Sequence, residues 1–289
     1  MPTGTYTIRE MQPDELRFAV DLAKAEGWNP GLDDQRCFFA ADPHGFLIGE
    51  LDGEPISSIS AVRYGDTYGF LGFYIVKPEY RKQKYGLGIW NAGMQYLANR
   101  DVGLDGVVAQ IANYEKSGFQ IAYFNARYEG QAAGGGQAPD ARIVELATVP
   151  FAELLAYDTQ VFAFPRAEFL RAWISQPGGT ALGIRAEGRL AGYAVLRPCF
   201  RGYKIGPLFA DDEQSAEALF QAVSARAPQG TPIFLDIPDQ QQNPAAHALV
   251  QRHAMRLVFE TARMYRRCAS GELRLPLARW FGVTTFELG

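Results

Sequence analysis

The sequence is poor in the residues that build metal sites and disulfide frameworks. Its 289 residues include three cysteines and three histidines. Cys37, Cys199 and Cys268 are scattered and form no Cys-x-x-Cys pair, which argues against a disulfide framework and against a structural zinc site. The three histidines are equally dispersed. We therefore expect reduced thiols and no bound metal.

Long apolar runs and an excess of positive charge are also missing. No apolar run reaches the roughly 18 residues of a membrane span, and the first residues lack the charged and apolar regions of a signal peptide. A net charge of −4 and a pI of about 5.5 give no general nucleic-acid-binding surface. We expect a cytoplasmic protein that binds neither membrane nor nucleic acid. The sequence leaves monomer and homodimer both open.

Two common nucleotide-binding motifs are absent. There is no Gly-x-x-x-x-Gly-Lys-Ser/Thr, so a nucleoside triphosphatase loop is not indicated. There is no Gly-x-Gly-x-x-Gly after a predicted strand, so a dinucleotide-binding fold is not indicated either. The composition, 47% hydrophobic and 21% charged, is that of a globular protein, and the length suggests two domains.

One stretch, Tyr74–Gly88, predicts a phosphate-binding loop. It reads as the end of a strand, a break at Pro78, a basic turn and the start of a helix. The first N–H groups of a helix lack partners, and the helix dipole favours negative charge there. Three cations and two glycines lie in this turn: Arg81, Lys82, Lys84, Gly86 and Gly88. The stretch therefore predicts a pyrophosphate site after a strand, although an ordinary basic turn has the same composition.

This stretch resembles motif A of the GNAT acetyltransferases, Val-x-Pro-x-x-Arg followed by Arg/Gln-x-x-Gly-x-Gly/Ala. Two registers fit, one starting at Gln83 and one at Arg81, and the second puts Lys84 in the position of the first glycine. The resemblance implies that acetyl-CoA is the acyl donor, with its pyrophosphate in the loop and its pantetheine arm beside the strand. The implied cofactor-binding residues are Tyr74, Ile75, Val76, Arg81, Lys82, Gln83, Lys84, Tyr85, Gly86, Leu87, Gly88, Asn113 and Tyr114.

A second segment, Asn113–Phe119, resembles the Asn…Tyr-x-x-x-Gly-Phe ending of the same family. The resemblance implies that Tyr114 protonates the coenzyme A thiolate as it leaves. A phenol with a pKa near 10 donates to a thiolate with a pKa near 8.5 only when the two are close. The alternative is that Tyr114 only packs its ring beside the pantetheine.

The residue that deprotonates the acceptor amine is not evident. Many GNAT enzymes place a glutamate on the strand before the loop, but Tyr68–Tyr74 contains no acid. The candidates are Glu50 on a neighbouring strand, Asp236 from the second half, or water. Each of these carboxylates has an ordinary structural role as its alternative.

Trp28 and Asn29 lie in a predicted loop, Trp-Asn-Pro-Gly, that follows the first helix. Binding residues are often carried on loops. We place both at the rim of an acceptor site between the two domains. A turn in which Trp28 fills the core explains the same residues.

The fold class expected is α/β (α+β), with two GNAT-like domains that each have a mixed, mostly antiparallel twisted sheet flanked by helices. Residues 1–130 form the first domain, the glycine-rich residues 131–140 a linker, and residues 141–289 the second domain, which repeats the order of the first. At the matching helix start, the second domain has the acids Asp211, Asp212 and Glu213, which repel phosphate. We expect no coenzyme A there.

Three functions remain in play on the sequence. The first is direct transfer of acetyl from acetyl-CoA to a primary amine of a small metabolite. The second is a non-catalytic acyl-CoA-binding module, and the third is acetylation of protein lysines or N-termini. The resemblance names no acceptor.

Overall fold

The computed structural model describes residues 4–134, 140–267 and 275–289, and its two halves repeat one order of elements. The first half contains β1 Tyr6–Glu10, α1 Leu16–Ala25, α2 Asp34–Ala41, β2 Phe46–Leu51, β3 Glu54–Tyr64, β4 Tyr68–Val76, α3 Tyr85–Tyr96, β5 Asp101–Val107, α4 Ile111–Lys116 and β6 Gln120–Gln131. The second contains β7 Ile143–Glu145, α5 Phe151–Phe162, α6 Ala167–Trp173, β8 Thr180–Ala186, β9 Arg189–Pro198, β10 Tyr203–Ala210, α7 Glu213–Ser224, β11 Pro232–Pro238, α8 Pro244–Arg252, β12 Arg256–Arg266 and β13 Trp280–Gly282. The expected α+β class and internal repeat are confirmed.

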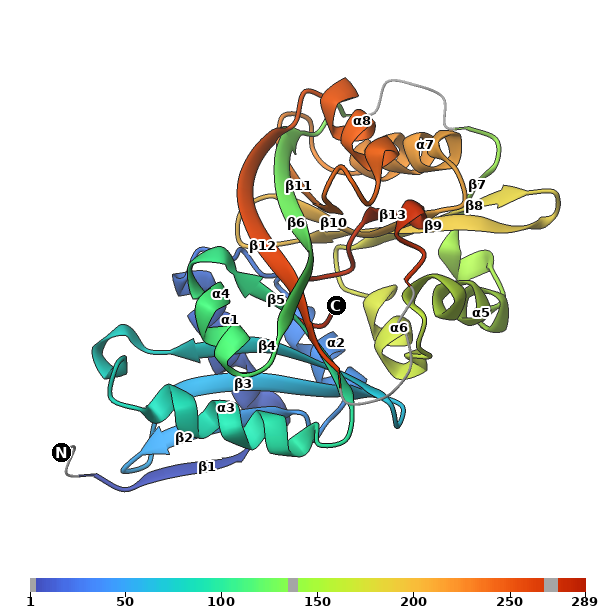
Figure 1. Cartoon of the computed structure of the whole chain (residues 1–289). Coiled ribbons are helices and arrows are strands. Elements are labelled where there is room, and N and C mark those ends of the chain that lie inside the picture. Colours follow the sequence, from blue (N-terminus) through green and yellow to red (C-terminus); the bar gives the residue numbers. More distant parts are fainter. Residues whose placement is uncertain (1–3, 135–139, 268–274) are drawn as a thin grey trace.

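The two halves share one sheet, in the order β1-β2-β3-β4-β5-β12-β6-β11-β10-β9-β8-β7. The strand that completes the repeated order in each half is exchanged: β12 pairs with β5 of the first half, and β6 pairs with β11 of the second. Figure 1 shows β6 and β12 as a long ribbon that runs from one half to the other. The pairing is mostly antiparallel, with β4–β5 and β10–β11 parallel.

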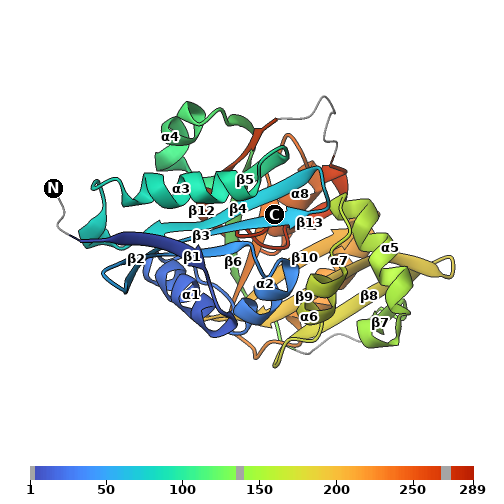
Figure 2. The same ribbon diagram turned by 90° about the horizontal axis from the view of Figure 1, so that it is seen from below.

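Helices cover both faces of the first half of the sheet (Figure 2), with α1 and α2 on one side and α3 on the other. Helix α1 forms because Leu16, Ala19, Val20 and Ala23 fall on one face at helical spacing, and all four are buried. The core beneath α1 and α2 continues into the second half, where the ring of Phe38 stacks on Trp173 at 5.8 Å between centroids. Shared strands and a shared core hold the halves together.

The expected boundaries at 130 and 141 stay a prediction, but the start of the expected linker is ordered. Ala132 is buried, and its N–H donates to the carbonyl of Thr231 at 2.9 Å. Residues 135–139 and Cys268 lie outside the described part of the chain. No helix within the described ranges is long and apolar enough to cross a membrane.

The C-terminal segment occupies a split in the second half of the sheet. Strands β10 and β11 pair over Tyr203–Ile205 and 233–235, and then separate. Strand β13 enters this split, pairs with β10, and is followed by a hydrogen bond from the Val283 N–H to the Asp236 carbonyl at 2.7 Å. The chain then continues toward β4, and both views place the C-terminus beside β4 (Figures 1 and 2).

Candidate active site

The matching split in the first half is open and forms a cavity. Strands β4 and β5 pair only over Tyr68–Leu71 and 101–104, and their facing edges separate beyond that point. A cavity of about 510 Å³ lies in the gap, a size within the range of small-ligand sites. A bulge at Phe73, with a φ of +46°, turns β4 at the mouth of the gap. The two splits therefore differ in that the chain fills one of them and leaves the other open.

The loop after β4 leads into an uncapped helix N-terminus. In the described part of the chain no side chain caps α3, and the first turn of α3 contains no acidic residue. Its first N–H groups are thus left for a ligand, and the helix dipole favours an anion there. Gly86 lets the first turn of α3 lie close to Tyr74 of β4, because a Cβ at residue 86 would stand 2.8 Å from the Tyr74 hydroxyl oxygen. Lys82, which also lines the cavity, adds a positive charge.

The backbone favours the register of the motif that starts at Arg81. Lys82 and Lys84 have φ values of +64° and +72°, a region that glycine adopts without cost. Lys84, in the position of the first glycine, is the N-cap of α3. Gly88, by contrast, packs α3 on β1, because a Cβ there would lie 3.2 Å from the Tyr6 ring. Lysine therefore takes the backbone conformation expected for glycine at this position.

The structure brings most of the predicted cofactor residues to the cavity wall. Tyr74, Ile75, Val76, Arg81, Lys82, Gly86, Asn113 and Tyr114 line it. The lining does not include Gln83 and Lys84 of the loop, or Tyr85, Leu87 and Gly88 in the first turn of α3. Among these, Tyr85 is buried against Tyr6, and Leu87 is 57% exposed. Arg81 is already engaged, since its guanidinium donates to the Val76 carbonyl at 2.9 Å and pairs with Glu26 at the end of α1.

Tyr114 on α4 lies in the wall of the cavity. Its ring packs on Trp90 of α3 at 5.6 Å, and Gly106 of β5 gives it room, since a Cβ there would lie 2.5 Å from the ring. Burial raises the pKa of Tyr114 to about 12, and the neighbouring Tyr74 adds to the effect. The phenol is therefore protonated at neutral pH, as a proton donor must be.

The two carboxylates considered as bases are not in the cavity wall, and both have other partners. Glu50 on β2 pairs with Arg9 of β1 at 2.6 Å. Asp236 on β11 is buried and pairs with Arg127 of β6 at 2.6 and 2.7 Å. Burial would raise the pKa of Asp236, but the Arg127 guanidinium outweighs it and holds the pKa below its usual range. Both assignments are therefore corrected to structural ion pairs.

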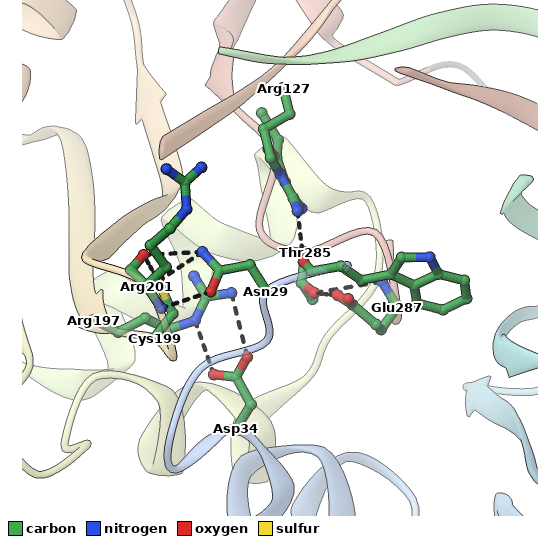
Figure 3. Close-up of polar contacts among 10 residues, drawn as sticks. Asn29, Asp34, Arg127, Arg197, Cys199, Arg201, Thr285 and Glu287 are labelled. Atoms are coloured by element: carbon green, nitrogen blue, oxygen red, sulfur yellow. Dashed lines mark hydrogen bonds and ion pairs between the residues drawn. The ribbon is translucent and has the colours of Figure 1, made fainter. Parts of the chain in front are cut away.

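Trp28 and Asn29 are neighbours in the loop after α1 but have different surroundings. Trp28 lines the cavity, and its carbonyl accepts a hydrogen bond from Arg127 at 2.6 Å. Asn29 instead ties the loop to the second half: its side-chain oxygen accepts from the Arg201 N–H at 2.8 Å, and its amide donates to the Arg201 carbonyl at 3.0 Å. Figure 3 shows Asn29 directed at Cys199 and Arg201, away from Glu287. The expected binding role of Asn29 is corrected to a contact between the halves.

Several residues of the cavity wall were not predicted. Asp105 lies on β5, and the others come from the exchanged strands and the C-terminal segment: Arg127, Phe259, Thr261, Phe286 and Glu287. Asp105 is held by Arg263 of β12 at 2.8 and 2.7 Å, and burial raises its pKa. Glu287 accepts a hydrogen bond from the Thr285 hydroxyl (Figure 3). No local motif marks these positions, since their role depends on pairing between distant strands.

Comparison with known proteins identifies the family. Residues 7–119 match the acetyltransferase (GNAT) family, and residues 154–274 match an acetyltransferase (GNAT) domain. A curated relative named holothin acyltransferase, from Pseudoalteromonas sp. (strain SANK 73390), is 32% identical over 262 residues, or 91% of this chain and 88% of the relative. The chain belongs to the GNAT acetyltransferases. It is an acyltransferase with two GNAT domains in tandem.

Solved structures agree with a tandem GNAT fold. A putative acetyltransferase from Pyrococcus horikoshii has a TM-score of 0.81 at 21% identity, covering 98% of this chain and 96% of its own. A tandem GNAT protein from the clavulanic acid biosynthesis pathway has a TM-score of 0.63 at 11% identity, covering 93% of this chain and 100% of its own. At these identities the likeness establishes the fold alone.

The second GNAT domain has a larger hollow with different chemistry. It measures about 1640 Å³ and lies beside α7 and α8. The α7 N-terminus in its wall is already capped, since the Asp212 side chain accepts from the Ser215 N–H at 2.8 Å, and Glu213 adds negative charge. A capped, acidic helix start does not favour a phosphate. The hollow thus lacks the properties of the α3 loop despite its size.

Proposed function

We propose that the first GNAT domain binds acetyl-CoA and transfers its acetyl group directly to a primary amine of a small metabolite. One observation carries the proposal: a single cavity connects the uncapped α3 N-terminus with Tyr114 and with a wall formed by the second half. A donor and an acceptor can therefore meet in it. The relative named holothin acyltransferase supports an acyl acceptor of low molecular mass.

The residues present fit acyl-CoA as the donor. The α3 N-terminus, Lys82 and Gly86 would hold the pyrophosphate, and the unpaired edge of β4 beyond Leu71 would hold the pantetheine arm. The donor supplies an activated acyl thioester. Arg81 reaches a phosphate only by leaving Glu26, so we assign it a weaker part than the backbone N–H groups.

Direct transfer is favoured by what lines the cavity. Neither cysteine nor serine is among the described lining residues. The hydroxyl of Thr261, which does line the cavity, has no hydrogen-bonded base among the described residues to activate it, so a covalent acyl-enzyme has no activated hydroxyl or thiol there. Cys199 is buried elsewhere, and burial raises the pKa of its thiol. The cavity therefore suits an amine that attacks the thioester itself.

Tyr114 is proposed to donate a hydrogen bond, and then a proton, to the leaving sulfur. With its pKa raised to about 12, transfer to a free thiolate of pKa about 8.5 is uphill by about 5 kcal/mol. The proton therefore moves as the carbon–sulfur bond breaks, when charge on the sulfur attracts it. A phenol is better suited to this than to rapid equilibrium acid catalysis.

A transfer assay tests the proposal. The protein is incubated with acetyl-CoA and a panel of small aliphatic and aromatic amines, and both free thiol and acylated amine are measured. Thiol release that requires an amine, with one N-acetylated product per thiol, is the expected result. Acetyl-CoA binding with no amine-dependent thiol release would instead favour the non-catalytic module, and acylation of proteins alone would favour the protein-modifying enzyme.

A further inference from the structure

The C-terminal segment delivers a carboxylate to the cavity of the other half. After β13, residues 283–289 are buried and pack against the first domain. The Tyr64 hydroxyl donates to the Leu288 carbonyl at 2.8 Å, and the Glu287 carbonyl lies against Gly72 of β4. A Cβ at Gly72 would stand 2.8 Å from the Glu287 carbonyl carbon, so only glycine admits this contact. The segment thus fixes Glu287 at the point where β4 and β5 separate.

The Glu287 side chain is placed for chemistry with a ligand. It is 4% exposed and lines the cavity, as does Tyr114. The Thr285 hydroxyl donates to one carboxylate oxygen, which orients the group (Figure 3). The other oxygen has no hydrogen bond within the described part of the chain. A buried carboxylate with a free acceptor atom is suited to an N–H donor.

The other acids of the cavity wall are already neutralised. Glu26 pairs with Arg81, and Asp105 is held by two bonds from Arg263 and one from Asn125. Glu287 forms no ion pair within 4.0 Å among the described residues. Arg127, whose pKa the Glu287 charge helps to raise, is bound to Asp236. The buried Lys204 of β10 also feels the charge of Glu287, which acts to raise the pKa of Lys204, although burial lowers that pKa overall. Glu287 is therefore the carboxylate of this wall that is left for a substrate.

A second polar group in the same wall points to a polar ligand. Thr261 on β12 is 2% exposed and lines the cavity, and its hydroxyl has no hydrogen-bond partner among the residues that the structure describes. Burying an unpaired hydroxyl is costly, so its presence indicates a ligand that bonds to it. The rings of Trp28, Phe259 and Phe286 form the rest of this wall. The wall suits an amine attached to a flat or apolar body.

We propose that the Glu287 carboxylate accepts the proton that the acceptor amine loses during acyl transfer. The proposal rests on the proposed function. The amine nitrogen forms its bond to the acyl carbon with its lone pair, and the carbon–sulfur bond breaks with its electron pair going to sulfur. One proton passes from nitrogen to Glu287, and the sulfur gains one from Tyr114. Solvent then carries the proton from Glu287 back to the phenolate, so the enzyme is restored.

Substitution of Glu287 tests the proposal, with acetyl-CoA as donor and an amine that the wild type acylates. We expect Glu287→Gln to lower kcat by roughly 10²- to 10⁴-fold, the range for loss of a general base, with unchanged acetyl-CoA affinity. Formate should restore part of the activity of Glu287→Ala, because it places a carboxylate in the vacated space. The matched control is Glu260→Gln, on exposed β12 surface between two lining residues, which should behave as wild type.

Each outcome decides between the two proposals. A kcat within threefold of wild type for Glu287→Gln, or a loss confined to the KM of the amine, overturns the role of Glu287 and leaves the acyltransferase intact. If neither wild type nor Glu260→Gln acylates any amine, the proposed function itself fails. If Glu287→Gln does not fold, Glu287→Asp takes its place under the same threshold, since the shorter side chain retains the charge but withdraws it from the amine.

Discussion

The close contact between Gly72 and the C-terminal segment leads us to expect that Gly72→Ala lowers both stability and kcat. In Gly72→Ala, the new Cβ would collide with the Glu287 carbonyl oxygen and lie 2.8 Å from the carbonyl carbon, whereas ordinary contact begins at 3.4 Å, so the segment must retreat by more than 0.6 Å. The obstacle is backbone, which cannot rotate away. Overpacking of this kind costs about 1–3 kcal/mol of stability. A displacement approaching 1 Å in a reacting group lowers the rate by roughly 10²-fold, which we expect for kcat.

Steady-state transfer and calorimetric binding together test this prediction. The affinity for acetyl-CoA should stay within about threefold of wild type, since the α3 loop begins after Val76, at the C-terminal end of β4, and does not contact the C-terminal segment at Gly72. The matched control is Gly69→Ala on the same strand, where the atoms nearest to the new Cβ belong to the Leu97 side chain, which can move, and not to the backbone. Wild-type kcat in Gly72→Ala would refute the reasoning that the C-terminal segment completes the site.

Three further substitutions test separate parts of the account. Tyr114→Phe should lower kcat by roughly 10²-fold with little effect on acetyl-CoA affinity; an unchanged kcat would mean that Tyr114 only packs in the wall. Because burial raises the pKa of Tyr114 to about 12, the wild-type rate should show no loss from ionisation of Tyr114 up to about pH 10. Lys84→Gly should raise the free energy of unfolding, measured by urea titration, by about 1 kcal/mol, because Lys84 has a φ of +72°, which is costly for lysine and not for glycine. A lower free energy of unfolding in the variant would show that the Lys84 backbone is not strained. Asp236→Asn should lower the free energy of unfolding by about 3–5 kcal/mol, since it leaves Arg127 buried and unpaired. Because the pKa of Asp236 is lowered in the folded chain, this stability is present above about pH 4 and is lost as the pH falls, so the wild type should become less stable in acid by a margin that Asp236→Asn does not show.

The fold and the donor side of the site were predictable because their signals are local. Strand β4, the break at Pro78 and helix α3 follow one another within one stretch of sequence, and each is encoded by its own residues. The repeat of the second half could be recognised in the same way, from the order of its elements. Gly72 also carried a signal, since a glycine inside a strand indicates close approach, although what approaches is the chain's own carbonyl.

The acceptor side was not predictable because it depends on distant pairing. Strand β12 lies between β5 and β6, and no residue of β12 encodes that neighbour by itself. The same applies to Glu287, whose position follows from β13 entering the split of the second half. Asp236 was misjudged because its partner, Arg127, lies opposite it on an exchanged strand. Pairs of this kind become visible only once the strand order is known.

The central claim is that one chain has one acyl-CoA site, at the α3 loop of the first domain. Calorimetric titration of acetyl-CoA into the wild type and into Gly86→Glu tests it most directly, because the glutamate would place a negative charge where the pyrophosphate is expected. We expect one molecule bound per chain in the wild type and none in the variant. Two molecules per chain, or binding that survives in Gly86→Glu, would contradict it.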